Sequence, residues 1–134
     1  MTRHEIREAA LILMYQMLLT GDKAEELAEA TTEAFEMPVN KSVMKLVENV
    51  TAHAEELDAV IGRYSPTRAV ERIARINLVI LRIALYEMKY AEDVPAKVAI
   101  NEAIELSKAY TEKNDSAFIN GILNSYYHAE GKKS

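Results

Sequence analysis

The stretch from Arg68 to Tyr90, RAVERIARINLVILRIALYEMKY, decides the fold. Its apolar residues fall at positions 73, 76, 80 and 83 and again at 78, 81, 85 and 88. These positions form two neighbouring stripes at helical spacing, so the predicted helix is apolar around most of its girth. Such a helix must be covered on several sides, which is typical of the central helix of a bundle.

One row of this helix is basic instead of apolar. It consists of Arg68, Arg72, Arg75, Arg82 and Lys89, with Val79 and Tyr86 between them. Guanidinium groups and an aromatic ring can stack on unpaired bases, and the charges can hold phosphates. Arginines in such a row can also pair with acidic residues of neighbouring helices. Spacing alone favours these ion pairs, and both interpretations stay open.

The composition indicates an all-α protein. The chain has 134 residues, with only 4 glycines, 3 prolines and no cysteine. This length suits one domain, or two small subdomains that share a core. The absence of cysteine excludes disulfides and thiolate metal sites. We predict a compact fold of about six or seven helices.

The charge is uneven along an acidic chain whose net charge is −5. Residues 1–66 hold 6 Lys and Arg against 12 Asp and Glu, whereas residues 67–134 hold 10 against 9. The overall charge argues against indiscriminate nucleic-acid binding, but the second half can present a local basic surface. No apolar run is long enough for a transmembrane helix, and no signal peptide is recognisable. We therefore expect a soluble cytoplasmic protein without membrane contact.

Caps and breaks divide the chain into predicted helices. They span about residues 3–20, 23–36, 41–61, 65–90 and 96–110, and a last helix follows the polar turn 113–116. Ser65 and Pro66 are predicted to start the central helix, and a short break near residues 68–72 is possible. Gly121 lies within the last helix, where a glycine usually allows another backbone to approach closely.

The chemical motifs of most enzymes are missing. The chain has no glycine-rich phosphate loop and no zinc-ligand spacing, and its histidines at positions 4, 53 and 128 are scattered. His53, with Glu56 three residues on, is best interpreted as a surface histidine. We predict that the protein is not an enzyme and that it needs no metal and no cofactor.

The first predicted helix carries two apolar faces. Its second half adds Ile12, Tyr15 and Leu19 on a different side from the core face. The helix is either buried on two sides or uses Tyr15 and its neighbours to bind a partner protein. Arg3, His4 and Arg7 form a small basic cluster at its start.

Two segments carry a family resemblance. The sequences ILRIALYEMKYAEDVPAKVAINEAIELSKAY, from Ile80, and SAFINGILN, ending at Asn124, resemble the signature of the NusB transcription antitermination factors. The opening REAALILMYQ is similar to the family pattern at Arg7, Glu8 and Tyr15. These motifs occur in the family's order and at its spacing.

The resemblance implies two small helical bundles packed together, at about residues 1–64 and 65–130. It also implies that the protein pairs with NusE, a ribosomal small-subunit protein. The pair would bind the boxA element of nascent ribosomal RNA. Other antitermination factors and RNA polymerase would be indirect partners, and a homodimer is possible.

The resemblance also implies roles for particular residues. Tyr15 and Glu87 match the surface that binds the partner protein. The positions associated with RNA are Arg3, His4, Arg7, Arg82, Asn114 and Phe118, to which we add Arg75 from the basic row.

The chain departs from the family pattern at two places. Many members have an arginine run at the N-terminus, where this chain has only Arg3 and Arg7. Asn77 and Leu78 replace a common acidic-basic pair. Because phosphate contacts contribute much of RNA affinity, we expect weak RNA binding by this protein alone and a stronger dependence on NusE.

Two alternative functions stay open. One is a NusB-like RNA-binding module of a ribosomal RNA methyltransferase, which would need a following catalytic domain, although the chain ends soon after Tyr127. The other is a protein-interaction module that has lost RNA binding.

Overall fold

The computed structural model describes residues 1–131, which form seven α-helices and no strand. The described residues form two compact units, residues 1–52 and residues 53–131. The all-α prediction is confirmed. The division falls between Ala52 and His53 rather than near residue 64, because the helix after His53 packs on the helices that follow it. No helix in the described part of the chain is long and apolar enough to cross a membrane.

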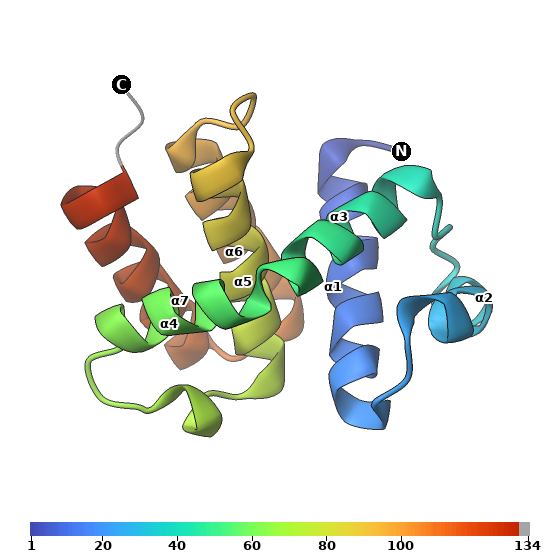
Figure 1. Cartoon of the computed structure of the whole chain (residues 1–134), viewed down its shortest axis with the longest axis horizontal. Coiled ribbons are helices and arrows are strands. Elements are labelled where there is room, and N and C mark those ends of the chain that lie inside the picture. Colours follow the sequence, from blue (N-terminus) through green and yellow to red (C-terminus); the bar gives the residue numbers. More distant parts are fainter. Residues whose placement is uncertain (132–134) are drawn as a thin grey trace. The chain divides into compact units, whose positions relative to one another are not determined.

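The first unit consists of α1 (Arg3–Thr20), α2 (Ala24–Phe35) and α3 (Lys41–Ala52), with α1 packed against both others (Figure 1). Thr2 and Glu5 form a capping box at the start of α1, and Gly21 ends this helix with a φ of 78°. The side chain of Asn40 caps α3 by accepting a hydrogen bond from Val43 N at 3.0 Å. These local caps explain why the bounds of α1 agree with the sequence prediction.

The second unit is built around α5 (Arg75–Tyr90). This helix packs against α4 (Ala54–Tyr64), α6 (Ala96–Tyr110) and α7 (Lys113–Tyr126), and α7 continues into η2 (Tyr127–Gly131). Figure 1 shows α5, α6 and α7 running side by side, with α4 crossing them. Every residue from Asn77 to Leu81 is buried, as is every residue from Ile83 to Leu85. The prediction of a central helix covered on several sides is therefore confirmed for the second unit.

The central helix is shorter than predicted. Residues 65–74 form a loop with one 3₁₀ turn, η1 (Val70–Arg72), and the helix begins at Arg75 rather than at Ser65 and Pro66. The backbone of Ile73 is extended, with φ −76° and ψ 133°, and the side chain of this residue is buried at 5% exposure. Burial of this side chain outweighs the local helix pattern, so tertiary packing decides where the helix begins.

The predicted long helix of residues 41–61 is interrupted. His53 has φ −104° and ψ 9°, which ends α3 and precedes α4. The prediction that another backbone approaches Gly121 closely is also wrong. A Cβ atom added at this glycine would meet no atom of the described residues within 4 Å. The sequence pattern therefore located the apolar faces but not these two details.

Candidate nucleic-acid interface

The loop between α4 and α5 is held in place by three contacts. The hydroxyl of Ser65 donates a hydrogen bond to the carbonyl oxygen of Arg68 at 2.7 Å. Val70 lies against the backbone of α4, since a Cβ added at Gly62 would be 3.3 Å from its Cγ2. With Ile73 buried as well, the backbone that carries the first arginines of the basic row is fixed on the second unit.

Arg68 contacts the N-terminal half of α7. The central carbon of its guanidinium lies over the ring of Phe118, 4.5 Å from the ring centroid. Arg68 is exposed and Phe118 is half-buried. This geometry is a cation–π contact at the surface of the molecule. No local sequence signal predicts it, because the two residues lie far apart in the chain.

A buried side chain joins the first turns of α5 and α7. Asn77 is 0% exposed, and its Nδ2 donates a hydrogen bond to Oδ1 of Asp115 at 2.9 Å. The other carboxylate oxygen of Asp115 accepts a hydrogen bond from Glu112 N at 3.2 Å, in the capping box that starts α7. The candidate residues Arg75 and Asn114, each in one of these two first turns, are thereby held at the same end of the second unit.

The amide orientation of Asn77 is determined by this contact. Within the described residues, no hydrogen bond reaches its buried Oδ1. Rotating the amide would place that oxygen against the Asp115 carboxylate, two acceptors facing each other. The sequence signal for this contact is a polar residue inside an otherwise apolar helix.

Arg72 and Arg75 complete an exposed basic surface. Both residues are exposed, and neither forms an ion pair with any residue between 1 and 131. We call Arg68 and Arg72, together with Arg75 at the first position of α5, the loop arginines. Their charges are not balanced within the described part of the protein, so they remain available to an anionic ligand.

Arg82 has a different environment. Its Nε and Nη2 donate hydrogen bonds to the two carboxylate oxygens of Asp58, each at 2.7 Å. The side chains of Arg82 and Asp58 are 13% and 28% exposed. This bidentate pair joins α5 to α4, so the guanidinium of Arg82 already has an internal partner.

Lys89 is also paired. Its ammonium donates to Oε2 of Glu56, and the hydroxyl of Tyr90 donates to Oε1 of the same carboxylate at 2.6 Å. The hydrogen bond from Lys89, followed by that from Tyr90, lowers the pKa of Glu56 below its ordinary value of 4.5. The same bond to Glu56 raises the pKa of Tyr90.

His53 belongs to this cluster rather than to the open surface. Its ring centroid lies 4.4 Å from that of Tyr90 and 5.6 Å from that of Tyr86, and the residue is half-buried. The prediction of a surface histidine is therefore corrected to a histidine packed against two tyrosines. No three His, Asp or Glu side chains of residues 1–131 are grouped so that they could hold a metal ion.

The candidate residues of α1 differ in how exposed their side chains are. Arg3 and His4 are exposed, but Arg7 is only 4% exposed and offers almost no surface to RNA. Tyr15 is half-buried, and Leu19, one turn later, is 52% exposed. Glu87 of α5 is 6% exposed, so it offers almost no surface to a partner in this structure.

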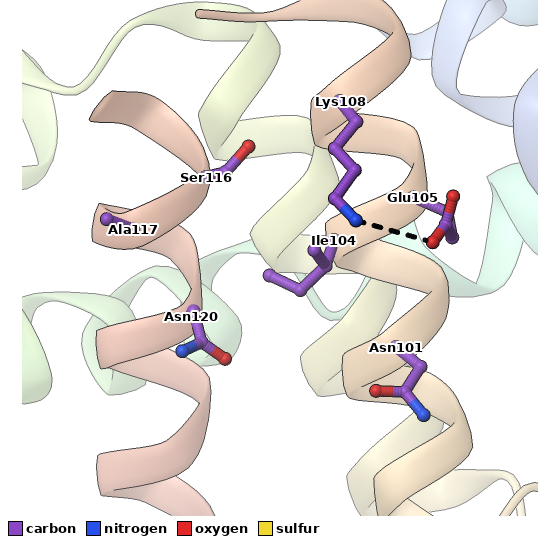
Figure 2. A pocket seen from close by; sticks show the side chains of 7 residues that line it. All are labelled: Asn101, Ile104, Glu105, Lys108, Ser116, Ala117 and Asn120. Atoms are coloured by element: carbon purple, nitrogen blue, oxygen red, sulfur yellow. Dashed lines mark ion pairs between the residues drawn. The ribbon is translucent and has the colours of Figure 1, made fainter. Parts of the chain in front are cut away.

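A hollow of about 560 Å³ lies between α6 and α7 (Figure 2). Figure 2 shows Ser116 and Asn120 of α7 across from Asn101 and Lys108 of α6. Nζ of Lys108 lies 3.8 Å from Oε1 of Glu105, so the basic group in this hollow has an acidic neighbour. A hollow without net charge is a poorer site for phosphates than the surface of the loop arginines.

The helical fold and the unpaired arginines define an all-α protein whose exposed surface is suited to binding another macromolecule. The model of the NusB family matches residues 4–128. The chain belongs to the NusB family, and the resemblance stated from the sequence is confirmed.

Curated relatives and solved structures agree with this assignment. The chain is 39% identical over 125 residues to the transcription antitermination protein NusB of Acetivibrio thermocellus, covering 92% of this chain and 86% of the relative. It is 41% identical over 130 residues to that of Lactiplantibacillus plantarum, covering 92% of each.

Among solved structures, NusB of T. maritima matches with a TM-score of 0.84 and 25% identity, over 98% of this chain and 94% of that one. NusB in a complex with NusE and double-stranded RNA matches with a TM-score of 0.81 and 23% identity, over 96% of this chain and 99% of that one. At 23% identity, this second match shows a shared fold and no more.

Proposed function

We propose that this protein is a transcription antitermination factor that pairs with NusE and binds boxA RNA. The membership of the NusB family supports the general role, and its curated relatives are transcription antitermination proteins. In this proposal the protein acts in the cytoplasm as an adaptor without catalytic activity. Other antitermination factors and RNA polymerase are then reached indirectly.

The observation that carries the RNA-binding part is the surface of the loop arginines beside Phe118 and Asn114. All three arginines are exposed and lack acidic partners among the described residues. Unpaired cations attract phosphates, and an arginine and an aromatic ring at one place suit the unstacked bases of single-stranded RNA. Arg3 and His4 are further exposed candidates on the first unit.

The two remaining RNA candidates have internal roles in this proposal. Arg82 is paired with Asp58, and Arg7 is buried. Taking either guanidinium out of its site to reach RNA would remove stabilising contacts from the folded protein. We therefore assign Arg82 and Arg7 to stability rather than to direct RNA contact.

For the partner protein, we propose the exposed edge of α1 that includes Tyr15 and Leu19. Half-buried aromatic and exposed aliphatic side chains together form the kind of apolar patch that protein partners cover. Glu87 can contribute only through the small part of its side chain that is exposed.

The test measures binding of a boxA RNA and of an unrelated RNA, with and without NusE, across a salt series. We expect a preference for boxA that NusE strengthens, and weak binding by this protein alone. Binding of NusE without any effect on RNA would instead favour an interaction module that has lost RNA binding. Tight binding of boxA without NusE at physiological salt would contradict the expected dependence on the partner.

One substitution separates the two binding surfaces. Tyr15→Asp places a charge in the proposed partner patch and should weaken NusE binding at least tenfold. It should leave RNA binding by the isolated protein nearly unchanged, because Tyr15 is not part of the loop-arginine surface. An equal loss of both activities would indicate that the variant is misfolded, which the helical circular dichroism spectrum would reveal.

A further inference from the structure

We propose that the guanidinium of Arg68 is the platform on which an unpaired RNA base stacks, and that Phe118 is a positioning residue that holds it there. This inference rests on the proposed RNA-binding function. It reverses the role implied for Phe118 by the family resemblance, in which Phe118 itself contacts RNA.

The contact geometry supports this division of roles. One side of the Arg68 guanidinium is directed at the Phe118 ring, 4.5 Å from the centroid. Arg68 as a whole is nevertheless exposed, whereas Phe118 is half-buried. A base that approaches from solvent therefore meets the guanidinium before it meets the ring.

The backbone on both sides of the contact is fixed before any ligand arrives. The Ser65 hydroxyl holds the carbonyl of Arg68, and the buried Ile73 anchors the end of the loop. On the other side, the Asn77–Asp115 hydrogen bond fixes the first turn of α7, from which Phe118 projects one turn later. Ordering an arginine in advance lowers the entropic cost of binding.

The chemistry of a guanidinium suits a stack of three layers. It is planar and weakly hydrated, so it can lie on an aromatic ring with one face and on a base with the other. A lysine at this position would keep the charge but would lose both planar contacts. Among the residues that the structure describes, Arg72 and Arg75 have no aromatic neighbour of this kind, so phosphates are their natural ligands.

The experiment scans one single-stranded RNA with abasic substitutions and measures the affinity of the complex with NusE for each RNA. If a base stacks on Arg68, one abasic position should lower the affinity of the wild type at least about fivefold, near the weaker end for base stacking. Arg68→Lys should remove the sensitivity to that position while binding keeps its salt dependence. Arg72→Lys is the matched control, an exposed arginine of the same loop whose substitution should leave the abasic profile unchanged.

Phe118 is tested by Phe118→Leu, which keeps apolar bulk and loses the ring. Because Phe118 acts through Arg68, this variant should lose sensitivity at the same abasic position, and the double variant should be no worse than Arg68→Lys alone. Thermal unfolding checks that each variant is folded.

Three results would overturn the inference. If Arg68→Lys keeps the abasic profile and Phe118→Leu loses it, the base stacks directly on the ring. If both variants keep the profile, the contact serves stability alone. If the wild type is equally sensitive at all positions, no single base is stacked at this site.

Different binding results would contradict the proposed function. Equal affinity of the wild type for boxA and for an unrelated RNA would remove the boxA assignment. The abasic scan would still test the platform on either RNA, because stacking tolerates any base. If the complex binds neither RNA, the proposed RNA-binding function and this inference are both wrong.

Discussion

The two ends of the basic row differ in how their charges are balanced. Arg82 and Lys89, on α5, are paired with Asp58 and Glu56 of α4. The loop arginines, at the other end, have no ion-pair partner among residues 1–131. One row in the sequence therefore serves two purposes, with internal ion pairs at one end and exposed positive charge at the other.

The comparison shows that the charge pattern alone does not indicate function. The row looked continuous because the sequence predicted one helix from residue 65 to residue 90, with only a possible short break near residues 68–72. The break at residues 65–74 moves Arg68 and Arg72 off the stripe that Arg82 and Lys89 share. The acidic partners of Arg82 and Lys89 both lie on α4, whereas no acidic side chain of residues 1–131 pairs with Arg68, Arg72 or Arg75.

The largest effect should come from breaking the Arg82–Asp58 pair. Arg82→Ala would leave a carboxylate that is 28% exposed without its bidentate partner. We expect a loss of about 2 kcal/mol in the free energy of unfolding, less than for a fully buried pair because water reaches Asp58. Urea unfolding monitored by circular dichroism measures it.

The Arg82→Ala variant also tests the division of the row. At temperatures where it remains folded, its RNA affinity should stay within about twofold of the wild type. Asp58→Asn, which removes the other partner, should cause a similar loss of stability. If Arg82→Ala instead loses RNA affinity much more than Asp58→Asn does, then Arg82 contacts RNA directly and the two ends of the row are not distinct.

For the loop arginines we expect a loss of RNA affinity with little change in stability, the opposite of the result expected for Arg82→Ala. The double variant Arg72→Ala/Arg75→Ala should change the free energy of unfolding by less than about 0.5 kcal/mol, because neither side chain has a partner to lose. Its affinity for single-stranded RNA should fall several-fold at low salt. The slope of log affinity against log salt should decrease by roughly 0.7 for each lost phosphate contact.

A salt series of fluorescence anisotropy titrations measures this slope. Lys41→Ala/Lys45→Ala, which removes two exposed charges from α3 of the other unit, serves as the matched control for net charge. Equal losses in the two double variants would mean that the overall charge of the protein matters and that the loop arginines form no specific site.

Much of the fold was predictable because its signals are local. The capping box at Thr2 and Glu5, the ending at Gly21 and the start after Pro95 all lie within a few residues of the helix ends they determine. The start of α5 was not predictable in this way. Its position depends on burial of Ile73 and on Val70 packing against α4, which are contacts between distant parts of the chain.

The candidate site follows the same rule. Residue types and the family resemblance indicated Arg75, Asn114 and Phe118, and the Asn77–Asp115 hydrogen bond holds the first turns of α5 and α7 together. Spacing alone favoured ion pairs for the basic row, but neither the partner of Arg82 nor the burial of Arg7 could be predicted, because both depend on which side chains another helix supplies. Arg68 received its place beside Phe118 only from the loop geometry.

The smallest effect should come from the exposed pair at the far end of α5. Glu56→Gln removes the charge that faces Lys89 but keeps an oxygen that can accept the hydrogen bond from Tyr90. We expect a loss of about 0.5 kcal/mol at pH 7 and low salt, as for other exposed ion pairs. Glu55→Gln, at the neighbouring exposed position without a partner among the described residues, is the control and should have no such effect.

The pH dependence distinguishes charge from packing in this pair. Because the folded-state pKa of Glu56 lies below 4.5, its ionised form adds stability at higher pH, and this contribution is lost as the pH falls through the lowered pKa. The difference in stability between wild type and Glu56→Gln should therefore be constant near neutrality and should shrink toward zero at the acid end of a urea-unfolding series. A difference that persists when Glu56 is protonated would mean that the pair contributes through packing, so that this end of the row is not held by its charges.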